Sequence, residues 1–163
     1  MEMQQAKKII INIKYIVFAL ASLLIISGIS IYFYYAGGAW YGTIFKPFIA
    51  PENDVNIIIW AIIYVIIAIS FYMVLNSKYD LQRENTLKMF LIDATLILIW
   101  SFLLYFKHDT WNAFVCIMIM MFCTYWLIKN IYLIKPKAAW LMLPYFFWIG
   151  ILTVINYNIV MLN

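Results

Sequence analysis

The chain has 163 residues, of which 67% are hydrophobic and only 11% are charged. A soluble domain carries about 25% charged residues to cover its surface, so this composition excludes a water-soluble globular protein and indicates a surface solvated by lipid. The formal net charge of +4 does not indicate nucleic-acid binding, because the Lys and Arg residues are scattered between apolar runs.

Five apolar runs are long enough to cross a hydrocarbon core as helices. They cover approximately 9–35, 56–75, 87–106, 111–132 and 138–162. None alternates apolar and polar residues as the strands of a membrane barrel do, and the first is too long for a removable signal peptide. The sequence therefore predicts an all-α membrane protein, a five-transmembrane-helix bundle that forms a single domain over 1–163.

Capping and helix-breaking residues stand between the runs. Asn53 and Asp54 offer an N-cap before the second helix, and Asp109 offers one before the fourth. Pro136 stands where the fifth helix would begin. Pro144 lies inside the fifth helix, where it removes a backbone hydrogen bond and is expected to bend the helix.

The basic residues predict an orientation. Three lie in the N-terminal flank (Lys7, Lys8, Lys14), three in the second loop region (Lys78, Arg83, Lys88) and three in the fourth (Lys129, Lys135, Lys137). The first loop has only Lys46, the third has only Lys107, and no basic residue follows the last helix. By the positive-inside rule the N-terminus is cytoplasmic and the C-terminus is outside. The regular alternation independently supports five spans.

Two ordered blocks carry a family resemblance. The first loop reads Trp40-Tyr41-Gly-Thr-Ile-Phe-Lys46-Pro47-Phe-Ile-Ala-Pro51, followed by Trp60-x-x-x-Tyr64, and Trp100-Ser101 comes later. The last run reads Ala138-Ala-Trp140-Leu-Met-Leu-Pro144-Tyr145-Phe-Phe-Trp148, then Asn156, and ends in Leu162-Asn163. The order and spacing of these blocks resemble the translocator protein (tryptophan-rich sensory protein) family.

The resemblance implies a five-helix bundle that encloses a ligand cavity, with a lid-like first loop folded over it. Family members bind porphyrins, sterols and synthetic benzodiazepine-type ligands and often form homodimers. The resemblance thus predicts a receptor or sensor in a bacterial cell membrane that binds a hydrophobic, planar small molecule such as a porphyrin or haem-type ring. The alternative is a transporter of such molecules, although no repeat or pair of broken helices suggests alternating access.

The chain departs from the family pattern at several cavity positions. Ile49 replaces the second Trp of the loop, Ile97 replaces an Asn of the third helix, Cys116 replaces an Asp of the fourth, and Leu152 replaces a small residue of the fifth. These changes predict a less polar cavity. Light-driven porphyrin breakdown is expected to be weak or absent given Ile49. No nucleophile–base pattern, metal-ligand spacing or cofactor motif indicates an enzyme.

The resemblance and helical geometry together give the candidate ligand-binding residues. Tyr145, Trp148, Leu152 and Asn156 share one face of the last helix, and Trp60 and Tyr64 share one face of the second. Packing between helices, or a place in an interfacial aromatic belt, is the alternative for such stripes. The candidate set is Trp40, Tyr41, Pro47, Trp60, Tyr64, Asp93, Trp100, Tyr145, Trp148, Leu152 and Asn156.

Asp93 is the one acid well inside an apolar run. It shares a stripe with Ile97 and Trp100, so it faces the cavity if Trp100 does. A carboxylate inside a membrane indicates function by default, but an ion pair with Lys88 at the headgroup boundary explains it equally well. His108 is expected to be a solvated loop residue.

Overall fold

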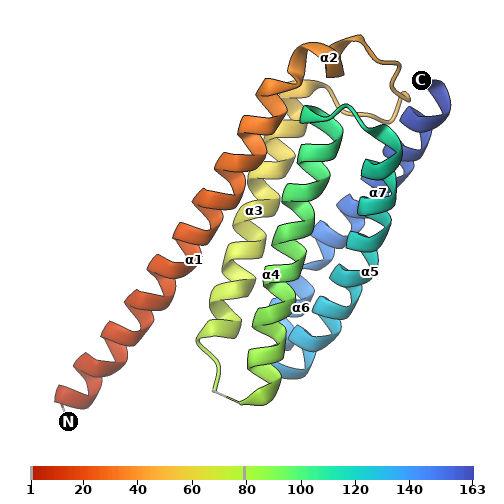
Figure 1. The fold of residues 1–163 in the computed structure, drawn as a ribbon. Coiled ribbons are helices and arrows are strands. Elements are labelled where there is room, and N and C mark those ends of the chain that lie inside the picture. Colours follow the sequence, from red (N-terminus) through yellow and green to blue (C-terminus); the bar gives the residue numbers. More distant parts are fainter. Residues whose placement is uncertain (1, 79) are drawn as a thin grey trace.

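The computed structural model describes the backbone of residues 2–78 and 80–163 and the side chains of 13–78 and 80–163. Within these residues the structure is helical, with no strand (Figure 1). The elements are α1 (Glu2–Ala36), α2 (Gly38–Thr43), α3 (Asn53–Leu75), α4 (Leu81–Ser101), the π-helix η1 (Phe102–Phe106), α5 (Thr110–Ile134), α6 (Pro136–Leu141) and α7 (Leu143–Leu162).

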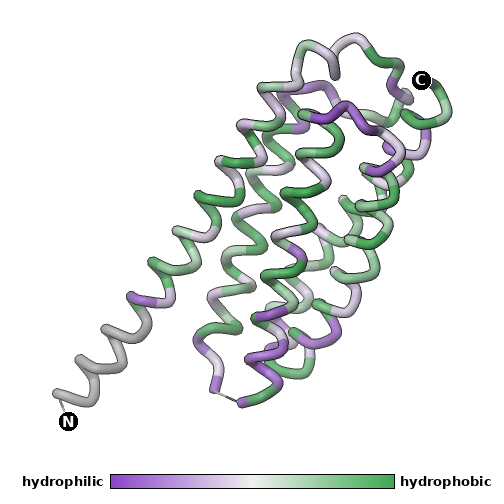
Figure 2. The backbone as a smooth tube through the Cα atoms, viewed as in Figure 1, coloured by the Kyte–Doolittle hydropathy of each residue, from purple (hydrophilic) through white to green (hydrophobic). Residues whose placement is uncertain are grey.

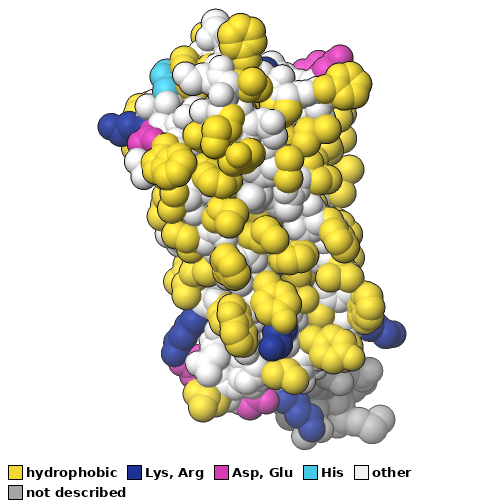
Figure 3. Space-filling view, turned by 90° about the vertical axis from the view of Figure 1, so that its right-hand side faces the viewer, with side chains coloured by type: hydrophobic (Ala, Val, Ile, Leu, Met, Phe, Trp, Pro, Cys, Tyr) yellow, Lys and Arg dark blue, Asp and Glu magenta, His cyan; other side chains and the backbone are white. Residues whose placement is uncertain are grey.

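The described residues contain five helices that are long and apolar enough to cross a membrane, which confirms the predicted fold class. Their spans are Ile13–Ala36, Asn53–Leu75, Leu81–Phe106, Thr110–Ile134 and Pro136–Leu162. Hydrophobic residues predominate along the middle of the helices (Figure 2), and on the face that Figure 3 shows, charged side chains gather near the two ends of the bundle. An apolar outer surface of this kind is expected of a protein that contacts lipid on all sides.

The helices form an up-and-down bundle in which α1, α4 and α7 run one way and α3 and α5 run the other (Figure 1). α5 packs against α4 and α7, α1 packs against α3, α4 and η1, and α6 packs against α3. We call the end that holds 37–52, 107–109 and 163 the lid end, and the end that holds 76–78, 80–81 and 135 the basic end. Towards the basic end α1 leans away from the other helices (Figure 1).

The predicted helix boundaries are right at some ends and wrong at others. Asp109 caps α5, its carboxylate accepting a hydrogen bond from the Asn112 backbone N–H at 3.0 Å, as predicted. The cap predicted at Asn53 or Asp54 is wrong, because α3 begins at Asn53 itself, preceded by Glu52, with no side-chain cap. α4 begins six residues before the predicted 87, since Asp80 caps a polar first turn that hydropathy alone does not reveal.

Two local irregularities interrupt the helices, the first nearer the basic end and the second at the lid end. The last span is interrupted at Met142, two residues before Pro144, so that α6 and α7 are separate helices, in line with the predicted bend. Between α1 and α2 lies Gly37, where any side chain would collide with the backbone of Tyr105 in η1. Glycine therefore allows the end of α1 to approach η1 directly and brings α2 over the bundle.

Candidate functional site: two cavities along α1, α3 and α4

A cavity of about 300 Å³ lies between α1, α3 and α4 in the half of the bundle nearer the lid end. We call it the upper pocket. Its wall is aromatic: the Trp60 ring lies 5.4 Å from the Tyr64 ring and 5.7 Å from the Trp100 ring, measured between centroids. Tyr105 in η1 adds a further ring, edge-on to Trp100 at 5.8 Å. The pocket therefore offers several faces for stacking an apolar ring.

Local structure places these rings. Trp60 and Tyr64 are four residues apart on α3, so their side chains lie one above the other on the same face. Trp100 is 1% exposed, and its indole Nε1–H donates a hydrogen bond to the Asn156 side-chain oxygen on α7 at 3.2 Å. Asn156 in turn donates to the Leu152 carbonyl at 2.8 Å. Trp100 is thus held from behind by α7 while it faces the pocket.

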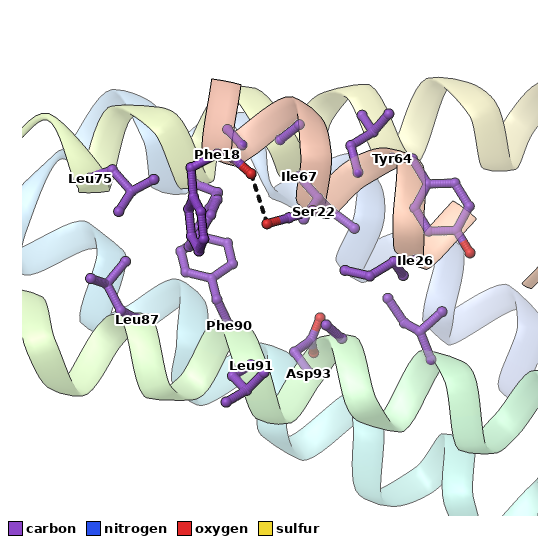
Figure 4. A pocket seen from close by; sticks show the side chains of 16 residues that line it. Phe18, Ser22, Ile26, Tyr64, Ile67, Leu75, Leu87, Phe90, Leu91 and Asp93 are labelled. Carbon is purple, nitrogen blue, oxygen red and sulfur yellow. Dashed lines mark hydrogen bonds between the residues drawn. The ribbon is translucent and has the colours of Figure 1, made fainter. Parts of the chain in front are cut away.

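A second cavity, of about 340 Å³, lies between the same three helices nearer the basic end. We call it the lower cavity. Figure 4 shows Phe18, Ser22 and Ile26 of α1 across from Phe90, Leu91 and Asp93 of α4. Leu23 and Tyr64 line both cavities, so the two cavities are neighbours that share these two wall residues.

Asp93 lies in the core at the wall of the lower cavity and is 2% exposed. Its carboxylate accepts one hydrogen bond from the Thr124 hydroxyl on α5 at 2.6 Å and another from the Tyr145 hydroxyl on α7 at 2.8 Å. The alternative of a headgroup-boundary pair with Lys88 is wrong. Lys88 is exposed and pairs with Glu84 one turn earlier at 2.8 Å.

The four predicted residues of the last helix do share one face of α7, and all four are buried. None of them lines the upper pocket or the lower cavity. Tyr145 and Asn156 contribute hydrogen bonds to Asp93 and Trp100, whereas the Trp148 indole Nε1 is buried without a partner among the described residues. This face packs into the core, and a role for it in contacting ligand stays a prediction.

The three predicted lid residues lie at the lid end and line neither cavity. Trp40 stacks on His108, with centroids 4.3 Å apart and planes 14° from parallel. His108 is an exposed loop residue, as predicted, and it also contacts the lid. Tyr41 packs edge-on to Tyr105 at 5.1 Å, and burial raises the pKa of Tyr41 to about 12. Pro47 forms a turn, its carbonyl accepting from the Ala50 N–H at 2.9 Å.

The loop is also fastened to the C-terminus. The Asn163 side chain accepts a hydrogen bond from the Phe45 N–H at 3.0 Å and donates one to the Phe45 carbonyl at 3.1 Å. Residues 38–52 therefore run over the end of the bundle from α1 to α7 (Figure 1). This is the arrangement expected of a lid.

Sequence reasoning missed the contribution of α1 to both cavities. Leu23, Ile26, Ser30 and Tyr34 contact the space from α1. A signal was present, because these residues and Ala19 recur at helical spacing of three or four on one side of an otherwise uniformly apolar run. Three of the four departures from the family pattern lie in the interior, since Ile97 lines the lower cavity and Cys116 and Leu152 are buried. The fourth, Ile49, is exposed and lines neither cavity.

Comparison with known proteins matches this arrangement to a family. The sequence profile described as the TspO/MBR family covers residues 15–162. The chain is 25% identical over 124 residues to a tryptophan-rich protein TspO of Bacillus cereus, an alignment that covers 76% of this chain and 80% of that protein. It is 29% identical over 126 residues to a tryptophan-rich protein TspO of Archaeoglobus fulgidus, with the same coverage of each chain.

Proposed function

Because this chain belongs to the TspO/MBR family, we propose that it is a membrane receptor that binds an apolar, planar ligand such as a porphyrin in the upper pocket. The observation that supports this proposal is the convergence of Trp60, Tyr64 and Trp100 on one cavity. Stacking on such rings contributes roughly 0.5–1.5 kcal/mol per aromatic pair beyond the area buried. A planar conjugated ring gains most from it.

The shape of the upper pocket fits partial insertion of a large ring. Its volume of about 300 Å³ accommodates on the order of ten non-hydrogen atoms, taking about 30 Å³ for each as for water in the liquid. Ile31 and Tyr35 on α1 and Val65 on α3 line the pocket and are also exposed on the outside of the bundle. A porphyrin would place one edge in the pocket against the rings of Trp60 and Tyr64 and extend between α1 and α3 towards lipid.

Titration of the purified protein with protoporphyrin IX, followed by quenching of tryptophan fluorescence, tests the proposal. Trp60→Ala is expected to weaken affinity about tenfold, or about 1.4 kcal/mol. Trp111→Ala is the matched control, because Trp111 is exposed on α5 and lines neither cavity. Equal affinities for the wild type and Trp60→Ala would contradict the upper pocket as the porphyrin site.

Transport of the same ligands is the second candidate. The observation in its favour is that the linings of the two cavities together follow α3 from Asn56 to Leu75, nearly its whole length. Protein in sealed vesicles separates the two functions. Saturable, protein-dependent entry of porphyrin into the lumen supports transport, and binding without entry supports a receptor.

We also propose that the basic end faces the cytoplasm, which places the C-terminus outside. Support comes from the uneven distribution of basic side chains, since Lys78, Arg83, Lys88, Lys129, Lys135 and Lys137 lie near the basic end and Lys46 and Lys107 near the lid end. In a variant without Cys116 and Cys123, a cysteine added after Asn163 should react with an impermeant reagent in intact cells. A cysteine added before Lys7 should not, and the reverse pattern would overturn the orientation.

A further inference from the structure

We propose that the lower cavity is a second ligand site, separate from the upper pocket, that binds an apolar amine with its protonated nitrogen paired to the Asp93 carboxylate. The ligand class is a single ammonium group on an alkyl or aryl body. The proposal rests on the position of Asp93 in the cavity wall, on the partners of its carboxylate and on the composition of the rest of the lining.

Apart from Asp93, the lining of the lower cavity is almost entirely hydrocarbon. Phe71 of α3 lies between Phe18 of α1 and Phe90 of α4, with ring centroids 5.9 Å and 5.1 Å away, and the three rings form one wall. The Ser22 hydroxyl donates to the Phe18 carbonyl of its own helix at 2.9 Å and is therefore already satisfied (Figure 4). The cavity thus combines an apolar lining with one acidic group.

The Asp93 carboxylate is hydrogen-bonded only through neutral groups. Thr124 and Tyr145 each donate to a different carboxylate oxygen, which leaves each oxygen with further acceptor capacity. Among the described residues no lysine, arginine or histidine forms a salt bridge with Asp93. A buried carboxylate without a cation is costly in a medium of low dielectric constant, and a cation that arrives with a ligand offsets that cost.

The two hydroxyl donors also fix where a cation would bind. They reach Asp93 from α5 and α7, two helices that contribute no residue to the lining of the lower cavity. In Figure 4 the Asp93 side chain points from α4 into the space that residues of α1 and α3 line. An ammonium group in the cavity would therefore approach a carboxylate already held in place, and a charge-assisted hydrogen bond of that kind is about twice as strong as a neutral one.

The cavity size and its opening agree with a small amphiphile that enters from the bilayer. A volume of about 340 Å³ accommodates on the order of ten non-hydrogen atoms, which suits an alkyl chain or a substituted aryl ring better than a porphyrin. Phe18 and Leu91 line the cavity and are exposed on the lipid-facing surface by 56% and 69%. The opening lies between α1 and α4.

The test compares radiolabelled dodecylamine with radiolabelled dodecanol, two ligands of equal chain length of which only the first is charged at neutral pH. Both are titrated onto the full chain in nanodiscs of zwitterionic lipid, and empty nanodiscs correct for partition into lipid. The wild type is expected to bind the amine saturably and about tenfold more tightly than the alcohol. Asp93→Asn is expected to bind the two ligands within about twofold of each other.

Asp54→Asn is the matched control, because it makes the same chemical change at an exposed acid in the first turn of α3 and should retain the wild-type preference. Equal affinity of the wild type for the two ligands, absence of saturable amine binding, or an undiminished preference in Asp93→Asn would each overturn the proposal. The wild-type comparison decides even if Asp93→Asn does not fold. Protoporphyrin quenching in the same nanodiscs reports the upper pocket separately, so failure of one site is not mistaken for failure of the other.

Discussion

The aromatic faces of α3 and α7 follow the same kind of helical spacing in the sequence but differ in what they contact. Trp60 and Tyr64 on α3 border an open pocket, whereas Tyr145 and Trp148 on α7 are buried against neighbouring helices. Helical periodicity identifies each pair as one face, but it does not say whether that face meets a cavity or another helix. The difference lies in the neighbours of each face, because both cavities lie between α1, α3 and α4 and no residue of α7 lines either of them.

The α7 face supports the pocket from behind. In the upper pocket, Trp100 donates a hydrogen bond to Asn156 of α7. In the lower cavity, Asp93 accepts one from Tyr145 of α7. Each cavity therefore has one wall residue that α7 holds in place. We therefore expect substitutions on α7 to act mainly on stability, and substitutions on α3 to act mainly on ligand affinity.

The largest effect is expected from Trp148→Ala. Trp148 is 8% exposed and its indole N–H has no partner among the described residues, so the loss is one of packing. Truncating a buried Trp costs roughly 3 kcal/mol, and the thermal unfolding midpoint in detergent should fall clearly. Trp140→Ala, at an exposed position on α6, is the control and should unfold close to the wild type.

Porphyrin affinity of the folded Trp148→Ala protein sharpens the comparison. We expect it to stay within about twofold of the wild type, a difference of under about 0.5 kcal/mol. A tenfold loss of affinity with an unchanged unfolding midpoint would place Trp148 at the ligand and contradict the division between the two faces.

A smaller effect is expected from Asn156→Leu, because the Asn156 side chain links α7 to Trp100 in the wall of the upper pocket. It leaves the buried Trp100 indole N–H without its acceptor, at a cost of about 1–3 kcal/mol. Because Trp100 then loses its fixed orientation, porphyrin affinity should fall together with the unfolding midpoint. Asn158→Leu is the control, since Asn158 bonds only the Val154 carbonyl of its own helix at 2.8 Å. If Asn156→Leu lowers stability but not affinity, Trp100 does not need α7 to bind ligand.

Much of the fold could be predicted from the sequence because lipid imposes strong constraints. Apolar runs of spanning length, Asp109 as a cap and Pro136 at a helix start are local signals, and each is confirmed. The start of α4 was missed because its first two turns are polar, so hydropathy alone places the helix too late.

The site was harder to predict because it depends on helix–helix geometry. Trp60, Tyr64, Trp100 and Asp93 were identified and do border cavities. The α1 wall was missed because its one signal, the helical spacing of the lining residues, lies within an otherwise uniformly apolar run. The partners of Asp93 were missed for a similar reason: Thr124 and Tyr145 lie 31 and 52 residues away in sequence, and only the bundle order brings them together.

The smallest effect on stability is expected at the N-cap of α5, which lies outside both aromatic faces. A substitution there serves as a reference for the stability measurements. Hydrogen bonds from the side chain and backbone of Asn112 lower the pKa of Asp109 below its ordinary value. Folding therefore favours the ionised carboxylate, and the cap contributes to the free energy of unfolding at pH values above the ordinary Asp pKa of about 3.9. This stabilisation is lost as the pH falls through the lower pKa that Asp109 has in the folded protein.

The corresponding prediction compares the wild type with Asp109→Ala. The wild type should be more stable near neutral pH by under about 1 kcal/mol, because the cap is exposed. The difference in unfolding midpoint should shrink as the pH is lowered towards 3. A difference that grows on acidification would mean that the carboxylate is not the capping group.

The central claim is that ligand binds between α1, α3 and α4 and not against α7. Photo-crosslinking with a diazirine-bearing porphyrin, mapped by mass spectrometry and competed with unmodified protoporphyrin IX, tests it most directly. We predict competed adducts on α1 around Ile31 and on α3 around Trp60, both of which line the upper pocket. Competed adducts confined to residues 145–156 of α7 would contradict it.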